Sequence, residues 1–319
     1  MPDIIVKVEN LRKTFGTVVA LDGVSLEVEA SSIFGLLGPN GAGKTTTVKA
    51  LTTLVRPDSG TARIAGVDVL SDPERARQLI GYIPQEVTVD NHLTAVEHLR
   101  YYAGLYHLPR ANREARISEL LDLVGLAGAQ NRRAKDFSGG MKKRLDLICG
   151  LIHSPQVVFL DEPSLGLDVQ TRQNLWSYII DLKKNGSTVF LCTNYMDEAE
   201  RLCDVVAIID RGKVVVSGAP ETLKGQLRRE IVSIEVAGLD GIRDAALEAL
   251  EKAVTGLSVV KATASSGAVL KIYVEGNGEA LPEIVRTANA LAVPIRSITH
   301  SRPGLDEVYL YYTGRAFSQ

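Results

Sequence analysis

An eight-residue, glycine-rich segment at residues 38–45 constrains the fold of this chain more than any other feature. It has the sequence Gly-Pro-Asn-Gly-Ala-Gly-Lys-Thr and fits the pattern G-x-x-x-x-G-K-[ST]. The apolar run at residues 32–37 predicts a strand before it. Residues 45–54 predict a helix after it, and turn-forming residues at 56–60 end that helix. Because this order of strand, loop and helix is the context that the pattern requires, a chance glycine-rich turn is disfavoured.

The chemistry of phosphate binding explains the residue types in this segment. Glycine residues allow backbone N–H groups to converge on phosphate oxygens without Cβ clashes. The helix that follows directs the positive end of its dipole at the same charge. We expect Lys44 to reach the β- and γ-phosphates of a nucleotide and the Thr45 hydroxyl to ligate Mg²⁺.

A pair of acidic residues follows a second apolar run. Residues 157–162 have the sequence Val-Val-Phe-Leu-Asp-Glu, which predicts a strand that ends in two carboxylates. Ligands of open parallel sheets bind at this carboxyl edge. Asp161 therefore suits a Mg²⁺ contact, and Glu162 suits a general base that activates water. Two solvated carboxylates are the alternative, which the phosphate loop makes unfavourable.

The 319 residues of the chain suggest two domains. Residues 88–150 are rich in Leu, Arg and Glu at helical spacing and predict a mostly helical subdomain. A predicted helix at 171–184 then alternates with predicted strands at 157–160, 188–192 and 205–209, an order that is typical of a parallel α/β sheet.

A second domain is predicted where the composition changes, near residue 225. Its predicted elements follow the order β-α-β-β-α-β, which is the ferredoxin-like split βαβ unit. The last residues, 303–319, are rich in aromatic side chains and are expected to dock on the fold. The strands are expected at residues 230–237, 257–263, 268–275 and 295–299, and the helices at 240–254 and 279–292.

One further segment resembles a family signature. Residues 137–141, Phe-Ser-Gly-Gly-Met, resemble the LSGGQ motif of ATP-binding cassette (ABC) ATPases, and they lie between Gln85 and the pair Asp161-Glu162. Residues 162–168 resemble the segment that leads into the D-loop of that family. The resemblance covers about residues 4–225. It implies a P-loop NTPase fold, with an α/β ABC ATPase domain at 1–225 and a helical subdomain at about 88–150. The strand and helix pattern adds an α+β ferredoxin-like domain at 226–302 and a docking tail at 303–319.

The resemblance also implies ATP and Mg²⁺ as cofactors and assigns a role to each matching residue. Phe15 would stack on adenine, and Gln85 would sense Mg²⁺ and face a membrane partner. The signature would contact the ATP of a second subunit, so a homodimer is expected. The nucleotide-binding residues implied are Phe15, Gly38, Pro39, Asn40, Gly41, Ala42, Gly43, Lys44, Thr45, Thr46 and Gln85. The Mg²⁺ ligands implied are Thr45, Gln85 and Asp161, and the contacts across the dimer are Ser138, Gly139, Gly140 and Asp168.

The chain departs from the family pattern at Asn194, where a switch histidine is usual. An amide can donate a hydrogen bond to the γ-phosphate but cannot carry a proton. We therefore expect three catalytic residues, Lys44, Glu162 and Asn194. Asn194 is expected to contribute only by positioning the γ-phosphate. Slow hydrolysis in this chain is the alternative.

The end of the chain resembles one group within the ABC ATPase family. Residues 303–310, Pro-Gly-Leu-Asp-Glu-Val-Tyr-Leu, resemble the closing motif of daunorubicin-resistance-type ATPases. That family implies a separately encoded ABC-2-type permease, export of a drug, lipid or polysaccharide, and a place on the cytoplasmic side of the cell membrane. No run approaches the roughly 18 apolar residues of a membrane span, so another chain is expected to supply the membrane part.

The sequence disfavours two other functions. A soluble ABC ATPase that acts on nucleic acid or ribosomes is disfavoured because the net charge is −2. For the same reason the run at residues 142–144, Lys-Lys-Arg, is expected to be a solvated helix face. A regulatory module without catalysis is disfavoured because binding alone needs no base at Glu162. The three cysteine residues show no metal-type spacing and are expected to be reduced and buried: Cys149, Cys192 and Cys203.

Overall fold

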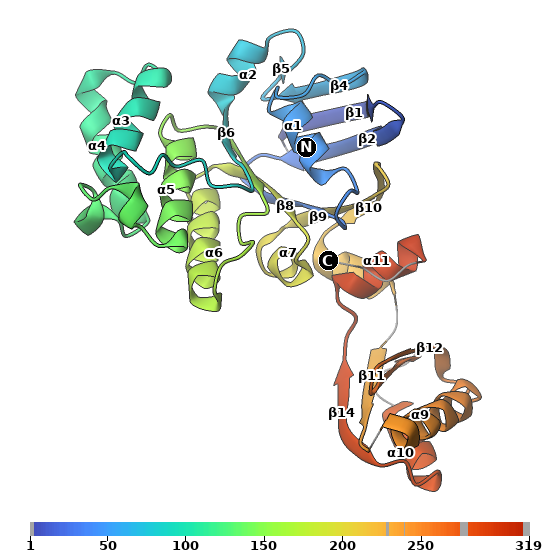
Figure 1. Cartoon of the computed structure of the whole chain (residues 1–319). Helices are drawn as coiled ribbons and strands as arrows, with labels where there is room; N and C mark the ends of the chain where they lie inside the picture. Colours follow the sequence, from blue (N-terminus) through green and yellow to red (C-terminus); the bar gives the residue numbers. More distant parts are fainter. Residues whose placement is uncertain (1–2, 228–229, 239, 275–279, 315–319) are drawn as a thin grey trace. The chain divides into compact units, whose positions relative to one another are not determined.

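The computed structural model describes residues 3–227, 230–238, 240–274 and 280–314 (Figure 1). The chain divides into two compact units. One extends to Pro220, and the other begins at Glu221. Among the described residues no helix is both long and apolar enough to cross a membrane.

A six-stranded sheet forms the centre of the first unit. Five of its strands run parallel, and β10 pairs antiparallel with β9 at one edge. Each predicted strand of this sheet is present, whereas β6 and β10 were not predicted. In sheet order the strands are β10 (Lys213–Gly218), β9 (Val205–Asp210), β3 (Ile33–Leu37), β8 (Thr188–Thr193), β7 (Val157–Asp161) and β6 (Ile80–Ile83).

The central strands read as continuous apolar runs because both of their faces are covered. Every residue of β3, β7 and β8 is buried. The connecting helices are α1 (Lys44–Leu51), α2 (Pro73–Leu79), α6 (Val169–Lys184) and α7 (Met196–Leu202).

A four-stranded antiparallel sheet completes the core of the first unit. Its order is β2 (Val18–Glu29), β1 (Ile4–Phe15), β4 (Ser59–Ile64) and β5 (Val67–Asp68). The alternating residues 18–28 predict a strand that Asp22-Gly23 would break, but β2 is continuous. Gly23 is skipped in the pairing and has a φ of 84°, so it forms a bulge rather than a break.

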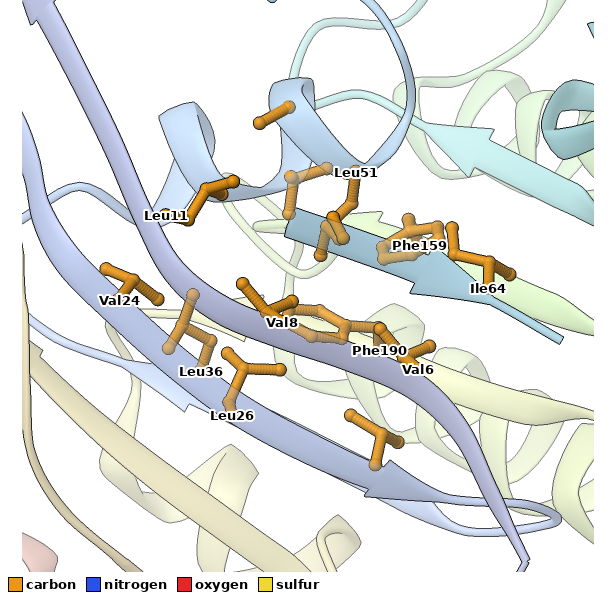
Figure 2. Packing of buried hydrophobic residues seen from close by; sticks show 14 of the residues in the cluster. Val6, Val8, Leu11, Val24, Leu26, Leu36, Leu51, Ile64, Phe159 and Phe190 are labelled. Carbon is orange, nitrogen blue, oxygen red and sulfur yellow. The ribbon is translucent and has the colours of Figure 1, made fainter. Parts of the chain in front are cut away.

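The two sheets and α1 share one hydrophobic core (Figure 2). Val6 and Val8 of β1 pack over Phe190 of β8, and Leu51 contributes from α1. The Phe190 ring lies 5.2 Å from the Phe159 ring, centroid to centroid. This packing fixes the start of α1 relative to the carboxyl ends of β7 and β8, where the predicted site residues lie.

The predicted helical subdomain is present. Thr94 begins its first helix with a capping box, in which its side chain and that of Glu97 each accept from the other's backbone N–H. The helices are α3 (Ala95–Leu105), α4 (Arg110–Leu123), α5 (Gly139–Leu151) and the short 3₁₀ turns η1 (Ala127–Ala129) and η2 (Ala134–Asp136).

The second unit has its own sheet and core. Its strands are β11 (Glu230–Val236), β12 (Val260–Ser266), β13 (Val269–Val274) and β14 (Ile295–Ser301), which pair antiparallel in the order β12-β13-β11-β14. With α9 (Asp240–Thr255) and α10 (Ala280–Ala290), they follow the predicted β-α-β-β-α-β order. The remaining helices are α8 (Pro220–Gln226) and α11 (Leu305–Thr313); residues 315–319 of the predicted docking tail lie outside the described residues.

Candidate functional site

The glycine-rich loop leads from β3 directly into α1. Gly43 precedes the helix with a φ of 113°, which a side chain would strain. Gly38 is equally constrained, because a Cβ there would lie 2.3 Å from the carbonyl oxygen of Ile209. The loop therefore needs glycine at both ends to enter the helix.

A cavity of about 550 Å³ opens over this loop. It gathers side chains from five separate parts of the sequence, and nine of them were predicted to bind nucleotide or to act on it. The lining residues are Val18, Val19, Ala20, Asn40, Gly41, Gly43, Lys44, Thr45, Thr46, Gln85, Glu162, Leu165 and Asn194.

The ammonium group of Lys44 lies within this cavity wall. It donates hydrogen bonds to the carbonyl oxygens of Gly38 and Pro39, at 2.7 and 3.2 Å. It also lies 3.6 Å from the Glu162 carboxylate, and the two side chains are only 4% and 8% exposed. A buried cation and a buried carboxylate therefore face each other at the loop.

Oxygen ligands suited to Mg²⁺ lie beside this pair. The Thr45 hydroxyl donates to a carboxylate oxygen of Asp161 at 3.3 Å. Asp161 is 1% exposed, and burial raises the pKa of its carboxyl. The Gln85 side chain belongs to the same cavity. Hydroxyl, carboxylate and amide oxygens are the donors that Mg²⁺ prefers, so the residues present fit that ion.

Glu162 has an unusual backbone conformation. Its φ is 47°, in the left-handed region that residues other than glycine rarely occupy, and its N–H donates to the carbonyl of Cys192 at 2.8 Å. Conformations of this kind cost free energy and cluster at functional sites. Asn194 lies on the same cavity, 6% exposed, and its Oδ1 has no hydrogen-bond partner within the described part of the chain.

Phe15 does not line the cavity. Its side chain is 48% exposed, and the Lys13 ammonium lies 5.3 Å from its ring. Val18 and Val19, which sequence reasoning missed, form the wall instead, although they are 63% and 54% exposed. In the sequence, the only sign of their place at the cavity is that they begin a strand directly after the turn at Gly16.

The predicted cross-dimer residues lie outside the cavity of their own chain. Ser138 caps α5, and its side chain accepts a hydrogen bond from the N–H of Met141 at 3.3 Å. Asp168 caps α6 in the same way through Thr171, at 2.9 Å. That backbone hydrogen bond lowers the pKa of Asp168. Both residues therefore stand at helix N-termini, where anions are favoured.

One prediction about the residues after this signature is wrong. The run at residues 142–144 was expected to be a solvated face, but the Lys143 side chain is buried, with 5% exposure. Its ammonium donates to backbone carbonyls of the segment that contains Gln85. The prediction about the cysteine residues is confirmed, since all three are free and buried.

Comparison with protein-family models gives one match, "ABC transporter", over residues 21–165. Curated relatives match along nearly the whole chain. The daunorubicin/doxorubicin resistance ATP-binding protein DrrA of Streptomyces peucetius is 37% identical, over 98% of this chain and 93% of its own. The doxorubicin resistance ATP-binding protein DrrA of Mycobacterium tuberculosis is 39% identical over 98% and 94%. The Nod factor export ATP-binding protein I of Ralstonia nicotianae is 34% identical over 98% and 94%.

Solved structures match the fold of the first unit. An ATP-binding subunit of an ABC transporter is 32% identical and superposes with a TM-score of 0.64, covering 70% of this chain and 92% of its own. The cbiO1 protein of Clostridium perfringens, 24% identical, gives a TM-score of 0.65 over 70% and 92%. This second likeness shows the fold alone.

Proposed function

The chain belongs to the ABC transporter family as an ATP-binding subunit, and from this premise we propose that it hydrolyses Mg-ATP in the cavity over residues 38–45 to power an exporter. The observation that carries the proposal is the meeting of the glycine-rich loop with Gln85, Glu162 and Asn194 around one cavity. Members of the family are ATPases, so the proposal concerns which residues of this chain bind and hydrolyse ATP.

In the proposed mechanism the buried pair at the loop performs the chemistry. Lys44 exchanges the carbonyl oxygens that it now contacts for the β- and γ-phosphate oxygens. Glu162, 3.6 Å from the Lys44 ammonium, then lies beside the γ-phosphate and accepts a proton from the attacking water. Thr45, Gln85 and Asp161 would hold Mg²⁺, which supplies a positive charge that neutralises the phosphates.

Asn194 is proposed to position the γ-phosphate. Its side chain is buried and lines the cavity, and its amide can donate one hydrogen bond without changing charge. Phe15 is proposed to stack on adenine, since its ring is 48% exposed and an aromatic face can stack on a flat ligand. The loop residues Pro39 and Ala42 are proposed to line the phosphate site. Pro39 has no backbone N–H to donate, so it is proposed to act by holding the shape of the loop.

A homodimer is proposed as the working unit. Ser138, Gly139, Gly140 and Asp168 would contact the nucleotide held by the second subunit, because they stand at helix N-termini away from the cavity of their own chain. Closure of such a pair excludes water from each site, a step that often limits turnover.

The partner is proposed to be a separately encoded ABC-2-type permease in the cell membrane, with this chain bound on its cytoplasmic side. The curated relatives are named for drug resistance and for Nod factor export, which supports export of a drug, lipid or polysaccharide over action on nucleic acid. The second unit is proposed to be a ferredoxin-like accessory domain at 226–302 with a docking tail. Its antiparallel strand order supports this.

The test of this proposal is the ATPase activity of the purified chain with Mg²⁺. We expect Glu162→Gln to lower turnover at least about a hundredfold while ATP still binds, because a general base contributes that much. Glu119→Gln is the matched control, since Glu119 is an exposed residue of α4 whose carboxylate pairs with Arg116. An unchanged hydrolysis rate in Glu162→Gln would remove the base assignment.

A further inference from the structure

Helix α5, which Ser138 begins, carries two charged side chains into the interior. Lys143 and Asp146 are both 5% exposed. They are three residues apart and therefore lie on the same face of the helix. That face meets the segment at residues 84–88, which follows β6 and contains Gln85.

Three hydrogen bonds join α5 to this segment. The Lys143 ammonium donates to the carbonyl oxygens of Pro84 and Gln85 at 2.9 and 3.1 Å. The Thr88 hydroxyl donates to Asp146 Oδ1 at 2.6 Å. Each bond has one charged partner, and such bonds are shorter and about twice as strong as neutral ones. Helix α5 therefore binds the segment at its start, through Pro84 and Gln85, and at its end, through Thr88.

These contacts are a poor way to gain stability. Burial lowers the pKa of Lys143 and raises the pKa of Asp146, although the opposite charges of the two groups act against both changes. Asp146 Oδ2 has no hydrogen-bond partner in the described part of the chain. Taking a charge out of water costs free energy that hydrogen bonds to neutral partners offset only in part. The arrangement is thus better explained by the geometry that it fixes.

The geometry links two places that nucleotide would occupy. Gln85 lines the cavity of its own chain, and its carbonyl is held by Lys143. Lys143 is five residues from Ser138, about 7 Å along one rigid helix. A shift of the Gln85 backbone on nucleotide binding would therefore be carried along α5 to its Ser138 end.

We propose that Lys143 and Asp146 are positioning residues that couple Gln85 in one subunit's cavity to the Ser138 end of α5, which completes the cavity of the second subunit. The proposal rests on the function proposed above. It assigns to the buried face of α5 the task of transmitting nucleotide occupancy between the two sites of the dimer.

The test replaces both charges at once, in Lys143→Met with Asp146→Leu, so that no unpaired charge is left buried. We expect this double variant to melt near the parent temperature and to keep its KM for ATP within about twofold, because the cavity is intact. We expect kcat to fall about tenfold or more, because misplacement of α5 impairs the second site. Lys142→Met is the matched control: Lys142 is the adjacent lysine, and its ammonium contacts Asn91 instead.

Thr88→Val removes, from an exposed position, the hydroxyl that donates to Asp146. Because the buried carboxylate then loses this donor, the melting temperature of the variant is measured beside kcat. The substitution should lower kcat severalfold without raising KM. A parent chain without ATPase activity would remove the proposed function and this inference with it. If the parent hydrolyses ATP, an unchanged kcat in the double variant or in Thr88→Val overturns the inference alone. A raised KM with unchanged kcat also overturns it.

Discussion

At the scale of single residues, the charges of the site are held in place by burial. Lys44 and Glu162 lie 3.6 Å apart with almost no exposure, and the Lys44 ammonium is also shared between two carbonyl oxygens. Their attraction is weakly screened there, so the Glu162 carboxylate remains close to the place that the γ-phosphate would occupy. The left-handed backbone of Glu162 aims the side chain into the cavity at a cost in free energy.

The first prediction at this scale concerns Asn194. Asn194→Ala removes the amide donor and should lower kcat about a hundredfold to a thousandfold, the usual cost of losing one donor to developing charge. Asn194→His restores a donor and should retain activity or raise it. Steady-state ATPase assays of the three proteins are the measurement. If the alanine variant hydrolyses ATP as fast as the parent, Asn194 has no positioning role.

The second prediction concerns pH. Burial raises the pKa of Asp161 above its ordinary value of 3.8, so this carboxylate takes up its proton at a higher pH than an exposed one. Mg²⁺ needs the ionised form. The apparent affinity for Mg²⁺ should therefore fall as pH is lowered toward that raised pKa. A Mg²⁺ titration of ATPase activity in neutral and in mildly acidic buffer measures this. ATP binding without Mg²⁺ serves as the control and should change less; equal changes would contradict the prediction.

The sequence could predict those residues whose role depends on a local motif. Lys44 and Thr45 follow from the glycine-rich loop alone, and Glu162 follows from its place at a strand end. Val18 and Val19 could not be predicted, because their position at the cavity is set by how two sheets pack. Lys143 could not be predicted either, since a lysine within a basic run gives no sign that tertiary contacts bury it.

At the scale of elements, continuous apolar runs were the reliable signal. Strands such as β7 and β8 are buried on both faces, so each appears in the sequence as an uninterrupted run. The pairing of β1 with β4 was not predicted, because it joins strands that lie about fifty residues apart in the sequence. Strand β5 has only two residues, which is too few to show any periodicity.

The element-scale prediction concerns the contact between β6 and α5. A Cβ at Gly81 would lie 2.3 Å from the carbonyl oxygen of Gly150, and neither backbone can yield without moving the helix. Gly81→Ala should therefore lower the free energy of unfolding by about 1–3 kcal/mol. Gly104→Ala is the control. It lies in α3 with no atom within 4 Å of the new Cβ and should stabilise by up to about 1 kcal/mol. Thermal unfolding followed by circular dichroism compares them; equal melting temperatures would refute the close contact.

At the scale of the whole molecule, two hydrophobic clusters of the described residues lie in different units. One joins the two sheets of the first unit with α1, and the other lies between the sheet of the second unit and helices α9 and α10. No residue belongs to both clusters as described. All cavity residues come from the first unit. Ligand binding should therefore stabilise one core and leave the other unchanged.

Calorimetry of the full chain tests this division. The Glu162→Gln variant, which should not consume ATP, is expected to show two unfolding transitions. Mg-ATP at a hundred times its Kd stabilises the bound state by about 2.7 kcal/mol, which raises the first unit's transition by about 5–10 °C. Leu250→Ala empties space in the second core, where Leu250 is fully buried, and should destabilise only the other transition, by about 2–5 kcal/mol. Because the two changes act on different cores, their effects should add without interaction. A single transition that moves with both ATP and Leu250→Ala would mean that the two cores unfold as one cooperative unit.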